Sequence, residues 1–114
     1  PAVTVADTVA NADRIIELID RAWKAGADSV VFPEMSVTAY TCADLFHSTA
    51  LLQGASEALR RICEHTLACP GMIVTVGAPV RLAPSLYNCA VLMSAGHPLA
   101  VVPKSYIPNY NEFY

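Results

Sequence analysis

Two short apolar runs in this chain of 114 residues end in the same way, at a proline followed by a charged side chain. Residues 29–34 end in Glu34, and residues 99–104 end in Lys104. Because β-branched and aromatic residues favour buried strands and proline cannot continue a ladder of hydrogen bonds, each run predicts a strand that stops at its proline. An acid and an amine are therefore expected at the carboxyl ends of two strands, where α/β sheets usually place their chemistry.

The rest of the chain predicts an α/β order of helix, strand, helix, strand and hairpin. Apolar residues recur at helical spacing after Asn11, a candidate helix cap, and up to Gly26, a candidate helix end. Residues 77–79 are expected to end the second strand. Continuous apolar strands predict a sheet that is covered on both faces. A second helix is expected at residues 48–68, and strands are expected at residues 29–32, 72–76, 87–93 and 99–102.

The apolar content is high for so short a chain: 54% of the residues are hydrophobic, 15% are charged, and the mean hydropathy is +0.41. A free-standing domain of this size exposes much surface, which needs polar side chains. No strand is evident before the first helix, although residues 1–5 could be the end of one, and the segment that begins at Ser105 reads as an unfinished loop. Residues 1–114 are therefore expected to be one part of a larger α/β domain.

Charge and composition argue against several classes of function. The net charge is −3 and the sequence pI is about 5.4, whereas nucleic-acid binders usually present a basic face. Every apolar run is shorter than the ~20 residues that a membrane-spanning helix needs, and no signal peptide is evident. The four cysteines form no CxxC pair and no zinc-type spacing. This pattern predicts free thiols in a reducing cytoplasm, with no metal site and no nucleic-acid or membrane partner.

Glu34 and Lys104 are the candidate catalytic residues, although each alone has an ordinary structural interpretation. The glutamate could cap a nearby loop, and the lysine could be a solvated residue at a strand end. If the two lie together over apolar side chains, the carboxylate could act as a general base and the amine could stabilise a developing oxyanion. The pair lacks a nucleophile. Cys42 is the only cysteine predicted on a loop near Glu34, and the other three are expected to be buried and inert.

Two further features leave alternatives open. Residues 104–114 carry four aromatic side chains, which could wall a small polar ligand or could pack against another subunit. Asn88 is flanked by apolar residues in the third predicted strand, and a satisfied buried amide is favoured there over a catalytic one.

The order of these features resembles the nitrilase (carbon–nitrogen hydrolase) superfamily: Phe32-Pro33-Glu34, then Asn88 in a strand, then a strand that ends in Lys104. The resemblance covers essentially the whole chain, and two longer pieces resemble the glutaminase domain of bacterial glutamine-dependent NAD synthetases. These pieces are residues 32–40 with 44–45, and residues 102–110 with 112–114. The resemblance implies an αββα sandwich of the nitrilase type, incomplete in this chain, and assembly into homo-oligomers.

The resemblance also implies roles for individual residues. Glu34 matches the family's general base, and Lys104 matches the residue that stabilises the tetrahedral intermediate. Tyr40 matches a pocket residue, and Tyr110 matches a glutamine-binding residue. The family's nucleophilic cysteine lies in a later segment and none of the four cysteines here matches it, so the 114 residues alone are expected to be inactive. One departure is Ala39, where the family usually has a glycine.

The reaction that the resemblance implies is the hydrolysis of glutamine, which releases ammonia. In the family, this ammonia passes to a synthetase domain of the same polypeptide, which uses ATP and Mg²⁺ to amidate nicotinic acid adenine dinucleotide to NAD. No cofactor is expected in the glutaminase part itself. The alternatives are a stand-alone amidase of the nitrilase superfamily and a non-catalytic structural or interaction fragment.

Overall fold

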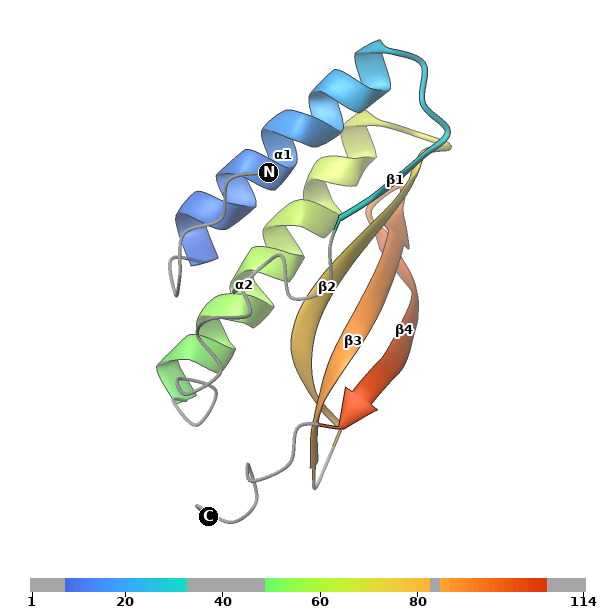
Figure 1. The fold of residues 1–114 in the computed structure, drawn as a ribbon. Coiled ribbons are helices and arrows are strands. Elements are labelled where there is room, and N and C mark those ends of the chain that lie inside the picture. The colour runs from blue at the N-terminus through green and yellow to red at the C-terminus, as the bar shows by residue number, and fades with distance from the viewer. Residues whose placement is uncertain (1–7, 33–48, 83–84, 107–114) are drawn as a thin grey trace.

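The computed structural model describes residues 8–32, 49–82 and 85–106. They form a mixed α/β arrangement in which two helices lie side by side on one face of a four-stranded sheet (Figure 1). The expected order of helix, strand, helix, strand and hairpin is confirmed. The elements are α1 (Thr8–Lys24), β1 (Ser29–Val31), α2 (Thr49–His65), the 3-10 turn η2 (Thr66–Ala68), β2 (Ile73–Leu82), β3 (Ser85–Ser94) and β4 (His97–Tyr106).

The strands lie in the order β1-β2-β3-β4. β1 is parallel to β2, which fits the helical connection between them, and β2, β3 and β4 are antiparallel neighbours. Side chains alternate between the two faces of each strand, so the helix-facing residues of β2 and β3 meet as register partners. Together with residues of both helices they form one core, whose largest fully buried side chains are those of Ile15, Ile19, Ile62, Met72, Val74, Val76 and Met93.

α1 begins at Thr8, three residues before its predicted start. The expectation that Asn11 caps this helix is therefore wrong. Asn11 is buried inside α1, next to the core residue Ala12. The buried stripe of the helix starts at these two positions, so the preceding turn has to be helical for them to face the core.

The C-terminal end of α1 is as predicted. Gly26 has a φ of +85°, which a residue without a Cβ adopts at no steric cost. Its N–H donates to the carbonyl of Trp23, and the N–H of Ala27 donates to the carbonyl of Ala22, both at 3.0 Å. This pair of backbone hydrogen bonds is the Schellman motif that ends a helix, and it turns the chain towards β1.

α2 together with η2 accounts for the second predicted helix, with a last turn that tightens to a 3-10 form. Ser48, the predicted cap, lies outside the described residues. Among the described residues, an ion pair of Arg61 with Asp13 at 2.6 Å and a hydrogen bond between His65 and Asp20 at 2.7 Å join α2 to α1. Their partly exposed side chains contribute little to stability each, so the apolar core remains the main force that holds the helices together.

β2 and β4 both continue past prolines that were expected to end them. β2 runs through Pro79 to Leu82. Because β1 pairs only with residues 73–75, this part of β2 has no described strand on its β1 side, and the missing N–H of proline removes no ladder bond there. β4 runs through Pro103, because it is an outer strand of the described sheet and its register shifts at that point. Lys104 therefore lies within β4 rather than beyond its end.

The helices cover one face of the sheet, and we call the opposite face the outer face. Register places Val31 of β1 and Val102 of β4 there, and they are 70% and 42% exposed. The predicted covering of both faces is not found within residues 8–32, 49–82 and 85–106. No helix in these ranges is long and apolar enough to cross a membrane.

Candidate functional site

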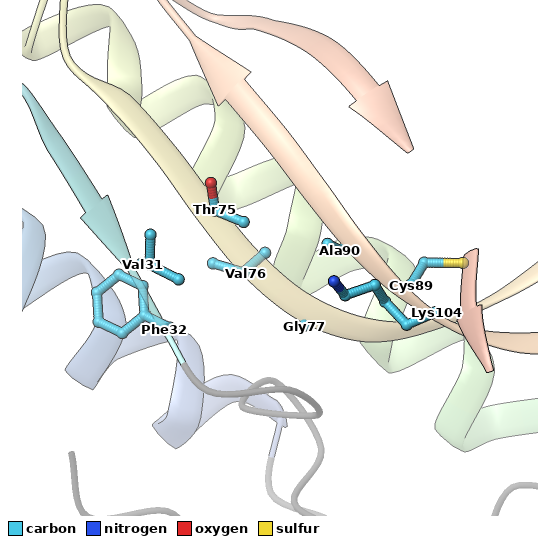
Figure 2. A pocket seen from close by; sticks show the side chains of 8 residues that line it. All are labelled: Val31, Phe32, Thr75, Val76, Gly77, Cys89, Ala90 and Lys104. Atoms are coloured by element: carbon cyan, nitrogen blue, oxygen red, sulfur yellow. The ribbon is translucent and has the colours of Figure 1, made fainter. Parts of the chain in front are cut away.

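A cavity of about 290 Å³ opens on the outer face of the sheet (Figure 2). All four strands contribute to it. Val31 and the next residue, Phe32, come from the carboxyl end of β1, and Lys104 comes from β4. The structure therefore brings the end of the first strand and the predicted catalytic lysine to one cavity. The remaining lining residues are Thr75, Val76, Gly77, Cys89 and Ala90 of β2 and β3.

The floor of this cavity is open because its central residues are small. Gly77 of β2 and Ala90 of β3 are register partners, and Figure 2 shows the amine of Lys104 directed towards them. Sequence reasoning missed this floor, since Gly77 was taken as the end of a strand. A glycine inside a strand often marks a place where a ligand or another chain approaches closely, and this was the available signal.

Lys104 occupies an irregular position in β4. Cys89 pairs with Pro103, and the neighbouring Asn88 pairs with Ser105, so one step along β3 corresponds to two steps along β4. Lys104 is the extra residue of this β-bulge. Bulges bend a strand and redirect a side chain, and they are frequent next to active sites.

The electrostatics of the described part of the cavity are simple. Lys104 is the one charged residue among the described lining residues, and the others are apolar apart from Thr75. The amine lies over an apolar floor, where its interaction with a negative charge is stronger than it would be in bulk water. An amine in this setting can stabilise an anion, and the role predicted for Lys104 stays a prediction.

The other predicted site residues fall in ranges that the structure does not describe. Glu34 follows the cavity residue Phe32 by two positions in the sequence, and Tyr40 and Tyr110 are farther from the described strands. The candidate nucleophile Cys42 also lies outside the described residues. The proximity of Glu34 to Lys104 therefore remains a prediction, as does the assignment of the two tyrosines to one cavity.

The three described cysteines are free, as predicted. Burial raises the pKa of the Cys63, Cys69 and Cys89 thiols, with a smaller contribution from Glu64 at Cys63. Cys89 lines the cavity, but it is fully buried and its thiol contacts the carbonyl of Tyr87 at 3.7 Å. A raised pKa leaves little thiolate at neutral pH, so the described cysteines suit a structural role better than a nucleophilic one.

Asn88 is only half satisfied, which corrects the expectation of a satisfied buried amide. Its Nδ2 donates a hydrogen bond to Oγ of Ser105 at 2.9 Å. Its Oδ1 is buried and has no hydrogen-bond partner in the described part of the chain. The sequence signalled a polar residue in an apolar strand but could not show which of its atoms would be left unpaired.

The described ranges contain no group of three or more His, Cys, Asp or Glu side chains that could hold a metal ion. Among the described residues, the chemistry available to the site is therefore that of an amine over an apolar floor.

The chain matches the family model described as carbon-nitrogen hydrolase over residues 2–112. It is 36% identical over 111 residues to the glutamine-dependent NAD(+) synthetase of Mycobacterium tuberculosis, covering 97% of this chain and 16% of that protein. It is 35% identical over 104 residues to the enzyme of the same name from Xylella fastidiosa, covering 90% and 18%. The chain thus spans less than a fifth of the length of these relatives.

Solved structures give the same picture. The glutamine-dependent NAD(+) synthetase of Cytophaga hutchinsonii superposes with a TM-score of 0.82 at 28% identity, covering 98% of this chain and 20% of that one. A nitrilase-superfamily amidase from Nesterenkonia AN1 gives a TM-score of 0.78 at 21% identity over 90% of this chain and 39% of that one, which is a likeness of fold alone. The predicted nitrilase-type fold, incomplete in this chain, is confirmed. The chain belongs to the carbon–nitrogen hydrolase family.

Proposed function

We propose that this chain is part of the glutaminase domain of a glutamine-dependent NAD synthetase. The observation that carries the proposal is the shared cavity, since the end of β1 and Lys104 meet on one apolar floor. The similarity to synthetases over nearly the whole chain supports the choice of reaction. The resemblance to the family assigns Glu34 and Lys104 to the hydrolysis of glutamine.

Glu34 is the proposed general base. It follows the cavity residue Phe32 by two positions in the sequence, and two residues of chain span at most about 7 Å. Lys104 is the proposed stabiliser of the anionic tetrahedral intermediate, with Tyr40 and Tyr110 as pocket and glutamine-binding residues. An amine placed where the negative charge of the intermediate develops lowers the barrier to its formation.

The reaction proceeds through a thiolate that is not supplied by the described cysteines. The thiol gives its proton to the Glu34 carboxylate, and the resulting thiolate attacks the amide carbon of glutamine. The C–N bond then breaks as Glu34 passes this proton to the leaving nitrogen, which departs as ammonia. Water then attacks the thioester, with the carboxylate accepting its proton, and glutamate is released with the thiol restored. The sum is glutamine plus water giving glutamate plus ammonia.

The ammonia would serve a synthetase domain of the same polypeptide, where ATP and Mg²⁺ drive the amidation of nicotinic acid adenine dinucleotide. We assign ATP and Mg²⁺ to that domain, as the resemblance to the synthetases implies. The proposal includes a cytoplasmic location, which free thiols favour, and assembly into homo-oligomers.

The test uses the complete protein that contains these residues and compares NAD formation from glutamine with NAD formation from ammonium. Glu34→Gln should lower the glutamine-driven rate by about 10²–10⁴-fold and leave the ammonium-driven rate unchanged. Glu17→Gln, at an exposed position of α1, is the matched control and should change neither rate. Equal loss of both rates in Glu34→Gln would contradict the assigned role. Hydrolysis of simple amides without NAD formation would instead indicate a stand-alone amidase.

A further inference from the structure

Asn88 is connected to the bulge that carries Lys104. It lies on β3, two residues before Ala90, so register places both on the outer face where the cavity opens. Across the sheet it pairs with Ser105, the residue directly after Lys104. The hydrogen bond from Asn88 Nδ2 to Ser105 Oγ, 2.9 Å long, therefore crosses from β3 to β4 next to the irregular position.

This bond lies at one of the two places where the β3–β4 register shifts. At the bulge the regular ladder is interrupted, and no further strand pairs with β4 among the residues that the structure describes. Pro103, on the other side of Lys104, has no N–H to donate. The side-chain bond to Ser105 thus supplies a constraint, directly next to Lys104, that the backbone of this segment lacks.

The destabilising effect of the unpaired Asn88 Oδ1 on the fold argues against a purely structural role for this residue. Its Oδ1 is buried without a partner in the described residues, and an unpaired buried acceptor destabilises a fold. An apolar residue at this position would avoid that cost. Residues that break a local rule in this way tend to lie at functional sites.

We propose that Asn88 is a positioning residue for Lys104: through Ser105 it holds the β-bulge in the shape that directs the lysine amine into the cavity. This inference rests on the proposed glutaminase function for its catalytic consequence, but the positioning itself is independent of the reaction.

The kinetic test compares Asn88→Ala, Ser105→Ala and the double variant in the complete protein. Asn88→Ala should lower kcat for glutamine hydrolysis by about 10–100-fold, because small displacements of a stabilising group cost rates of this order. KM and ammonium-driven NAD formation should stay near the wild-type values. Ser105→Ala should have an effect in the same direction, and the double variant should be no worse than Asn88→Ala, because both act through one bond.

The thermal midpoint of Asn88→Ala shows whether Asn88 positions Lys104 or only stabilises the fold. Asn88→Ala removes an unpaired buried acceptor, so its thermal midpoint should equal or exceed that of the wild type while kcat falls. A parallel loss of stability and activity, additive effects of the two substitutions, or an unchanged kcat would overturn the inference.

A second measurement does not need the reaction. Lysines labelled with ¹³C at Cε give NMR signals, and the Lys104 signal is assigned by its loss in Lys104→Arg. Asn88→Ala and Ser105→Ala should both shift or broaden this signal, whereas Ser94→Ala, which lies at the far end of β3, should not. If the wild type proves to have no glutaminase activity, the proposed function fails while this result still decides whether Asn88 positions Lys104. An unchanged Lys104 signal in both variants would refute the positioning role.

Discussion

The turn between β3 and β4 offers a prediction that can be worked out in detail. Ala95 and Gly96 form a two-residue turn between the register partners Ser94 and His97, with φ values of +50° and +81°. Positive φ at both central residues is the requirement of a type I′ turn. Glycine meets it freely, but an alanine in the left-handed region costs about 1–2 kcal/mol. This turn sets the β3–β4 register at its own end of the hairpin, before the register shift between Leu92 and Met93.

Replacing Ala95 by asparagine, which tolerates the left-handed region, should recover about 1 kcal/mol of unfolding free energy. For a chain of this size, that corresponds to a rise of the thermal midpoint of about 4 °C. Ala95→Gly removes the same strain but gives the unfolded chain about 0.4–1 kcal/mol of additional entropy, so its net gain should be smaller.

Urea denaturation followed by circular dichroism measures these differences. Ala68→Asn, at an exposed position of η2 with negative φ, is the control and should bring no gain. At position 95, the variant with Asn should be the most stable, the variant with Gly should come next, and the wild type with Ala should be the least stable. If Ala95→Asn were no more stable than the wild type, the turn would not have the strained type I′ geometry. The β3–β4 register next to the turn would then have to be set by other contacts.

Three further predictions concern the core, a second turn residue and the thiols. Ile62→Ala, at a fully buried position, should cost about 2–5 kcal/mol in a urea titration, because it leaves a cavity in the core. Gly96→Ala should be more destabilising than Gly26→Ala by thermal denaturation: both have positive φ, but an added Cβ at Gly96 would lie 2.7 Å from a leucine side chain of η2, whereas nothing lies within 4 Å of one at Gly26. Burial raises the pKa of the Cys69 and Cys89 thiols, so the stability they confer is fully present below the unfolded value of about 8.5 and is lost as the pH rises through the native value. Urea midpoints under reducing conditions should therefore fall between pH 7 and pH 10, and a variant with alanine at both cysteines should show a smaller fall.

The sequence predicted the elements well where local chemistry decides the outcome. Gly26 ends α1 because glycine adopts a positive φ at no steric cost. The presence of a glycine can be read from the sequence alone. The helical and strand runs follow from the spacing of apolar residues. Asn11 was misread as a cap, because only the packing of α1 on the core shows that the helix begins one turn earlier.

The prolines show where local reasoning stops. A proline ends a strand only if the missing N–H would have been paired, and this depends on which strand lies beside it. Pro79 faces a side of β2 that β1 does not reach, and Pro103 adjoins a bulge, so both strands continue. Strand order and register are properties of the whole sheet, and the sequence of one strand does not contain them.

Some features of the candidate site can likewise be predicted from the local sequence, and others depend on the register of the whole sheet. The residue type of Lys104 and its place after an apolar run were sufficient to predict it as a site residue. Its bulge, the open floor at Gly77 and Ala90, and the half-paired amide of Asn88 depend on the register between β2, β3 and β4. Glu34, Tyr40 and Tyr110 lie outside the described residues, and their part in the site rests on the sequence and the family.

The central claim is that the cavity at Lys104 serves glutamine hydrolysis. Its most direct test is the ratio of glutamine-driven to ammonium-driven NAD formation by the complete protein with Lys104→Ala, compared with Lys24→Ala. These are the two lysines of the 114 residues, and Lys24 lies at the end of α1 and is not among the cavity residues. The account predicts that the ratio falls about 10²–10³-fold in Lys104→Ala and stays at the wild-type value in Lys24→Ala. An unchanged ratio in Lys104→Ala would contradict it.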